Sequence, residues 1–129
     1  MEGKNTTGSA HPAVLILACS GAADVGAVAD QAARKLTREG LGKMYCLAGI
    51  GGKVEAILSN ALSSPKTVAI DGCGMNCTRM TLVHQNVPLH AHVNLASLGM
   101  EKGKSPATEE NVEKAAAHIR ALLADKGSR

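Results

Sequence analysis

Short apolar runs alternate along the chain with longer segments whose apolar residues recur at helical spacing. The runs of strand length fall at residues 13–18, 43–47, 67–70 and 90–95. The segments with helical spacing fall at residues 23–38, 53–62 and 76–84, and a last one runs from Thr108 to just before Gly127. This alternation predicts right-handed crossovers between parallel strands. We therefore expect an α/β fold: a small Rossmann-like, three-layer domain with a mostly parallel sheet of about four strands and helices on both faces.

The two ends of the chain set the bounds of the predicted domain. Residues 1–11 are polar and lack periodicity, so we expect a disordered tail there. Residues 12–126 are expected to form one domain, because 129 residues with 45% hydrophobic and 19% charged residues are typical of a single globular unit. A domain of this size is stable without a metal or disulfides, so any metal site has a purpose beyond holding the fold together.

Composition argues against several classes of partner. The chain has no Trp, no Phe and one Tyr, and its formal net charge is only +3. We therefore expect no nucleic-acid partner, because such partners need aromatic platforms or dense positive charge. No apolar run approaches the roughly 20 residues of a transmembrane helix, so no membrane partner is expected. The chain has the character of a cytoplasmic protein, and there four cysteines favour metal or thiol chemistry over disulfides.

Three of the four cysteines follow predicted strands. Cys19, Cys46 and Cys73 stand at equal intervals, each at the C-terminal end of a strand, which is the edge where open parallel sheets bind ligands. Cys77 comes one helical turn after Cys73, so we expect both thiols on one face of the third helix. All four thiols are expected to meet at one place. Cys46, in the weakest strand, is the one most typical of an inert core cysteine.

A metal ion is the expected partner of four converging thiols. Zinc fits the number and type of these ligands, because structural zinc sites are tetrahedral and often all-cysteine. An iron–sulfur cluster also takes four thiolates, and the residues leave both cofactors open. The sequence indicates neither a small-molecule substrate nor a protein partner.

Several polar residues stand next to these cysteines. Asp71 ends the third strand and is expected to accept N–H hydrogen bonds from the following loop or helix, although it could also support a metal ligand. Ser20, Lys53 and Arg79 are candidates for hydrogen-bonding or charge-compensating neighbours of the thiolates. Each of them could equally face water.

Glycines surround the same segments. Gly72 and Gly74 flank a cysteine on both sides, which indicates a sharp turn of the backbone. In the glycine-rich stretch at residues 49–53, Gly51 and Gly52 are expected to allow close approach of the backbone near the thiols. This stretch lacks the glycine and hydroxyl positions of the common nucleotide-binding fingerprints.

Together these motifs resemble a known family. DGC at residues 71–73 with a second cysteine four residues later, CSG at 19–21 and CLAGIGG at 46–52 are similar to the DGC domain family, over about residues 14–123. The family is named for the motif and is regarded as zinc-binding because of its four cysteines. The resemblance implies Cys19, Cys46, Cys73 and Cys77 as ligands of one zinc ion. It implies little about a cellular role.

Other chemistries use the same residues. Cys73 and Arg79 form a C-x5-R pattern, in which a thiolate and an arginine act on an oxyanion, as in phosphatases and arsenate reductases. Cys73 and Cys77 could also act as a redox pair, so whether the protein is an enzyme stays open. His90 and His92 share a face of the fourth strand and could bind metal, but they are more typical of the polar side of an edge strand.

Overall fold

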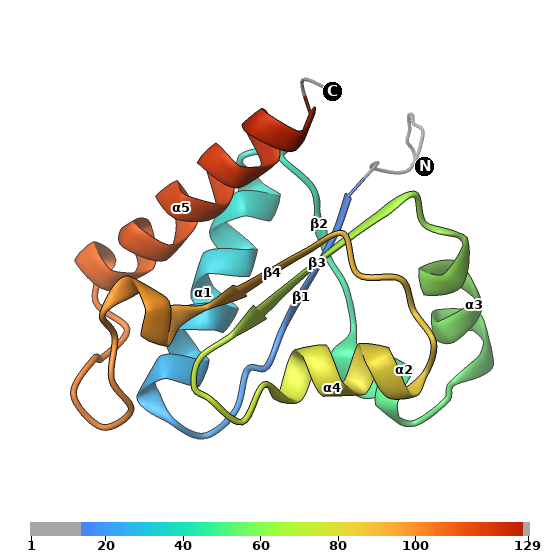
Figure 1. Ribbon diagram of the computed structural model, residues 1–129, viewed down its shortest axis with the longest axis horizontal. Coiled ribbons are helices and arrows are strands. Elements are labelled where there is room, and N and C mark those ends of the chain that lie inside the picture. The colour runs from blue at the N-terminus through green and yellow to red at the C-terminus, as the bar shows by residue number, and fades with distance from the viewer. Residues whose placement is uncertain (1–13, 128–129) are drawn as a thin grey trace.

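We describe residues 14–127 of a computed structural model (Figure 1). The tail expected at residues 1–11 lies outside the described residues. The elements are, in chain order, β1 (Val14–Ala18), α1 (Asp24–Arg38), β2 (Lys43–Met44), α2 (Leu47–Gly51), α3 (Glu55–Ser63), β3 (Lys66–Asp71), α4 (Cys77–His84), β4 (Ala91–Asn94), the 3₁₀ helix η1 (Leu95–Leu98) and α5 (Glu109–Gly127). No helix in this part of the chain is both long and apolar enough to cross a membrane.

The four strands form one sheet in the order β2-β1-β3-β4, and every neighbouring pair is parallel. Ile16 of β1 pairs with Met44 of β2 on one side and with Val68 of β3 on the other. The C-terminal ends of all strands therefore meet at one edge, which is the lower edge in Figure 1. The parallel sheet expected from the sequence is confirmed.

Helices cover both faces of this sheet. Ile16, Val68 and Ile70 lie in a core cluster with α1 and α5, whereas Leu17 and Ala69 lie in a second cluster with α2, α3 and α4. Successive side chains of a strand point to opposite faces, so a continuous apolar run serves both cores. Figure 1 shows α1 and α5 on one side of the strands and α3 on the other. The predicted three-layer arrangement is confirmed.

The segment after β2 differs from the sequence prediction. We expected strand up to residue 47 and then a glycine-rich turn, but β2 ends at Met44 and Leu47–Gly51 forms α2. The close approach also falls on a different glycine: a Cβ atom on Gly49 would lie 2.4 Å from Cδ1 of Ile57 in α3. At Gly51 the nearest neighbour, a Thr81 methyl, would be an ordinary 3.5 Å away. Gly49 thus lets α2 pack against α3, which helical spacing alone does not reveal.

Charged side chains join α1 to α5 on the surface. Arg120 of α5 donates hydrogen bonds to Glu39, which caps α1, and to Glu113 on its own helix, each over 2.9 Å. Lys35 of α1 lies 3.2 Å from the same Glu113 carboxylate. The hydrogen bonds from Arg120 and then Lys35 lower the pKa of Glu113 to about 2. This network fixes the position of α5 against α1 at the rim of the core.

The lowered pKa of Glu113 predicts acid sensitivity. The ionised Glu113 carboxylate contributes its full stabilisation above its ordinary pKa of 4.5. This stabilisation is lost as the pH falls toward the lowered pKa of about 2. We expect Glu113→Gln to reduce the fall in unfolding free energy across this window, measured by urea unfolding at several pH values. The change should be modest because the pair is exposed and screened by solvent. Glu110→Gln, exposed on the same helix, is the control, and an unchanged slope in Glu113→Gln would contradict the prediction.

Candidate functional site

Three cysteines follow adjacent strands at the C-terminal edge of the sheet. Cys19 directly follows β1, Cys46 follows β2 after one residue, and Cys73 follows β3 after one residue. Because the sheet order is β2-β1-β3, these are the ends of three adjacent strands, spaced roughly 4.8 Å apart. Cys77 begins α4, on the same connection as Cys73. The sequence prediction that these strands are neighbours is confirmed.

All four cysteines are free thiols, and none is fully buried. Cys46 and Cys77 are exposed, whereas Cys19 and Cys73 are partly buried. Cys46 is the N-cap of α2, and its Sγ accepts a hydrogen bond from the backbone N–H of Gly49 over 3.3 Å. The alternative of an inert core cysteine does not apply to Cys46, because this residue is exposed and the chain leaves the sheet before it.

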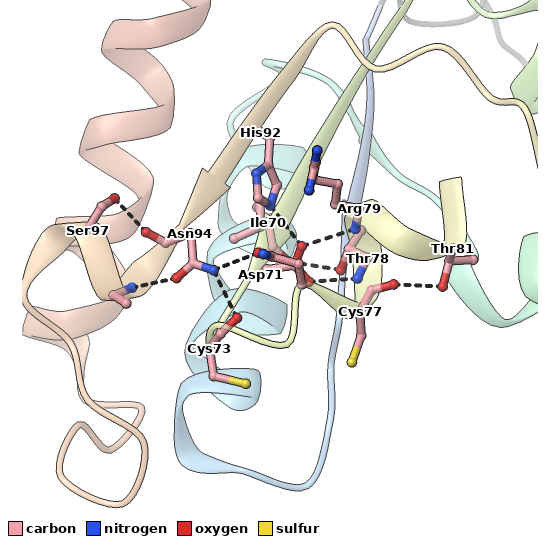
Figure 2. A network of polar contacts seen from close by, with 12 residues as sticks. Ile70, Asp71, Cys73, Cys77, Thr78, Arg79, Thr81, His92, Asn94 and Ser97 are labelled. Atoms are coloured by element: carbon pink, nitrogen blue, oxygen red, sulfur yellow. Dashed lines mark hydrogen bonds and ion pairs between the residues drawn. The ribbon is translucent and has the colours of Figure 1, made fainter. Parts of the chain in front are cut away.

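Cys73 and Cys77 do not share a helix. Helix α4 begins at Cys77, and the preceding Asn76 has left-handed backbone angles, with φ 55° and ψ 46°. The N–H of Asn76 donates to the carbonyl oxygen of Cys73 over 3.2 Å, which closes a tight turn. The predicted pair on one helix face is wrong in this detail. Figure 2 shows both sulfur atoms on the side of the turn that faces away from His92.

The thiols share an edge without forming a finished metal cluster. Across residues 14–127, no three His, Cys, Asp or Glu side chains are grouped closely enough to hold a metal ion. Cys19 and Cys46 line one open hollow between the ends of β1 and β2, and the lining does not include Cys73 or Cys77. The donor set still suits zinc in kind and number, since four free thiols lie at one sheet edge. Binding one ion with all four would require the cysteine-bearing loops to draw together.

Asp71 anchors the start of α4 from inside the protein. Its side chain is 1% exposed, and its two oxygens accept the backbone N–H groups of Thr78 over 2.7 Å and Arg79 over 3.1 Å. His92 Nε2 of β4 lies 2.9 Å from the same carboxyl group. Asp71 thus satisfies donors that the first turn of a helix leaves unpaired. Asp71 therefore supports the turn, and none of these hydrogen bonds joins it to a thiol.

Asn94 at the end of β4 holds the turn from the other side. Its side-chain nitrogen donates to the carbonyl oxygen of Cys73 over 2.9 Å and to the side-chain oxygen of Asn76 over 2.7 Å (Figure 2). The oxygen of the same amide accepts the N–H of Ala96 and caps η1. Sequence reasoning did not identify Asn94. An asparagine at the end of a predicted strand is a capping signal, but nothing local shows that it also reaches residue 73.

Glycines seat both cysteine loops on α1. A Cβ atom on Gly72 would lie 2.7 Å from the backbone carbon and oxygen of Val25 and 2.9 Å from the nitrogen of Gly26. A Cβ atom on Gly26 would in turn lie 2.8 Å from the backbone of Gly21. The first turn of α1 therefore touches the loops after both β1 and β3. Gly74 lies inside the tight turn closed by the Asn76–Cys73 hydrogen bond, but it has open space around it and no positive φ, so this position does not require a glycine.

The other candidate neighbours of the thiols differ in position: Ser20 lines the same hollow as Cys19 and Cys46, whereas Lys53 and Arg79 do not. Ser20 donates to Asp30 over 2.7 Å, and Asp30 also pairs with Arg34. Lys53 is exposed after α2, with φ 58°. In Figure 2 the guanidinium group of Arg79 points away from both sulfur atoms, so this conformation does not bring it to the thiols. His92 is engaged with the buried Asp71, in keeping with a polar side of the edge strand β4.

Comparison with known proteins identifies the family of the chain. Residues 15–119 match the model of the DGC domain. The chain belongs to the DGC domain family. It is also 32% identical over 119 residues to the anaerobic and virulence modulator AnvM of Pseudomonas aeruginosa, which covers 92% of this chain and 91% of that protein. No solved structure matches the chain. The family match spans the strands that precede the cysteines. In the structure, Asp71 of the DGC motif caps α4, Gly72 packs against α1, and Cys73 carries a partly buried thiol.

Proposed function

We propose that this member of the DGC domain family binds one Zn²⁺ through Cys19, Cys46, Cys73 and Cys77. The observation that carries the proposal is the sheet order, which places three of these thiols at the ends of three adjacent parallel strands. The fourth begins the helix that follows the central turn. Thiolate sulfur binds zinc at about 2.3 Å, so the loops must draw together around the ion.

The surroundings of the thiols suit a negatively charged metal centre. Four thiolates and one Zn²⁺ carry a net charge of −2. Cys46 caps α2, and the backbone N–H of Gly49 donates to its sulfur, whereas the N–H groups of Thr78 and Arg79 at the start of α4 donate to Asp71. Such N–H groups stabilise nearby negative charge. The charge compensation that we first assigned to Lys53 and Arg79 is thus supplied in part by the backbone.

The structure gives less support to a thiol enzyme. A phosphatase-like or arsenate-reductase-like reaction at Cys73 needs Arg79 over the bound oxyanion, and the guanidinium group of Arg79 points away from both thiols in Figure 2.

We propose that the protein binds metal in a regulatory role and is located in the cytoplasm. The description of the relative AnvM as a modulator and the free state of all four cysteines support this role and this location.

Metal analysis of the full chain, purified without chelators, tests the proposal. We expect one zinc per chain, release of that zinc to a chromogenic chelator only after the thiols are modified, and loss of most zinc in Cys77→Ser. Cys77 is exposed, so this variant should keep the circular dichroism spectrum of the parent protein. Ser59→Ala, exposed on α3, is the control and should keep its zinc. Metal-free protein that does not take up added zinc, or a visible absorption band with bound iron, would overturn the zinc proposal.

A further inference from the structure

A hollow of about 750 Å³ opens between the ends of β1 and β2. It is distinct from the turn that carries Cys73 and Cys77, and Cys19, Met44 and Cys46 all line it. Helix α1 contributes Asp30 and Arg34 to the rim, and the opposite side is formed by α2 and by Thr81 of α4. Three of the residues around this one space carry sulfur.

The side-chain oxygens of four residues that line the hollow, Ser20, Asp30, Tyr45 and Thr81, take part in hydrogen bonds. Both oxygens of Asp30 accept hydrogen bonds, one from Ser20 and one from Arg34, each over 2.7 Å. The hydroxyl groups of two further lining residues are also engaged: Tyr45 donates to the carbonyl oxygen of Ile57 over 2.9 Å, and Thr81 donates to that of Cys77 over 2.7 Å. A ligand entering the hollow would therefore meet sulfur as its main available donor.

We propose that Cys19, Met44 and Cys46 form a binding site for monovalent copper. Two thiols and a thioether are soft donors, and such donors select Cu(I) over harder divalent cations. Zinc requires four ligands, and the hollow offers only two thiols with the carboxyl group of Asp30 already engaged. Cu(I) accepts a lower coordination number, which three sulfur atoms can satisfy. The hydrogen bond from Gly49 to Sγ of Cys46 holds that sulfur in place.

This site goes beyond the zinc proposal and does not depend on it. Both metals would use Cys19 and Cys46, so the two are expected to exclude each other. Met44 belongs to the copper site alone, whereas Cys73 and Cys77 belong to the zinc site alone. Substitutions at these positions therefore separate the two proposals.

Titration of the metal-free full chain with Cu(I), in competition with bathocuproine disulfonate under anaerobic reducing conditions, tests the copper site. We expect the protein to withdraw one Cu(I) per chain from the chelator. Met44→Leu keeps the side-chain volume but removes the sulfur, and it should lower Cu(I) affinity on the order of tenfold without changing zinc binding. Met80→Leu, in which an exposed methionine of α4 outside the hollow is changed, is the matched control and should bind Cu(I) normally.

Two further variants complete the test. The double variant Cys73→Ser, Cys77→Ser should lose zinc and keep Cu(I). Cys46→Ser, at an exposed position, should lose Cu(I) while keeping the fold. Wild-type Cu(I) affinity in Met44→Leu or Cys46→Ser would overturn the copper site, and so would loss of Cu(I) in the double variant. A chain that takes up Cu(I) in this pattern but no zinc would refute the zinc proposal alone.

Discussion

Gly72→Ala is expected to lower the free energy of unfolding by about 3 kcal/mol. The added methyl group would lie 2.7 Å from backbone atoms of Val25 and 2.9 Å from the backbone nitrogen of Gly26. These are main-chain atoms in the first turn of α1, so no side-chain rotation can make room. The turn after β3 or the helix itself must move. Urea unfolding of the metal-free protein, followed by circular dichroism, measures the loss.

Gly74→Ala provides a control inside the same motif. Nothing lies within 4 Å of a Cβ atom at this position, and its φ is not positive. We expect its unfolding free energy to stay within about 0.5 kcal/mol of the parent protein. Equal stability of Gly72→Ala and Gly74→Ala would contradict the close packing between the turn and α1. Both variants keep the cysteines, so any difference between them comes from the backbone.

Asp71→Ala is expected to have a similar effect, again about 3 kcal/mol in the metal-free protein. The substitution leaves the N–H groups of Thr78 and Arg79 without the acceptor that they now share, and it removes the partner of His92. At least the first of these donors is deeply buried, because Thr78 is 0% exposed. Unfolding with urea gives the size of the loss, and near-complete retention of stability would refute the capping role.

A double-mutant cycle with His92→Ala separates the two parts of this effect. If the contact between His92 and Asp71 contributes to stability, the double variant should lose less than the sum of the two single losses. The remaining loss then belongs to the helix cap. His92→Ala alone should be the milder change, because its side chain is 22% exposed and water can replace part of the contact.

The fold follows closely from the pattern of apolar residues. The runs that became β1 and β3 are buried on both faces, and this continuous burial is why they could be recognised and placed at the centre of a parallel sheet. All four longer helices begin within two residues of their predicted starts, at Asp24, Glu55, Cys77 and Glu109. Helix α2 was missed because three of its five residues are glycine or alanine, which give no clear apolar periodicity. Its packing through Gly49 also depends on a tertiary contact with Ile57.

The candidate site was predictable only where it depends on strand order. The adjacency of Cys19, Cys46 and Cys73 follows from parallel topology, but the direction of each thiol does not. The left-handed Asn76 separates the last two cysteines into a turn and a helix start, and no local spacing reveals this. The contact of Asn94 with residue 73 joins segments 21 residues apart. Such contacts between distant segments are set by tertiary packing and lie outside what periodicity records.

The anchoring of the turn by β4 has a consequence for the order of events during synthesis. All four cysteines precede residue 78, whereas His92 and Asn94, which hold Asp71 and the carbonyl of Cys73, are made later. A nascent chain that has folded only as far as residue 85 therefore contains all four cysteines. It still lacks β4, which holds the turn between Cys73 and Cys77 in place. Cys73 and Cys77 then lie on an unsupported turn, where stray metal ions and oxidants can reach their thiols. Loading of the proposed zinc ion is therefore expected after the ribosome has released β4, once the sheet has gained its fourth strand.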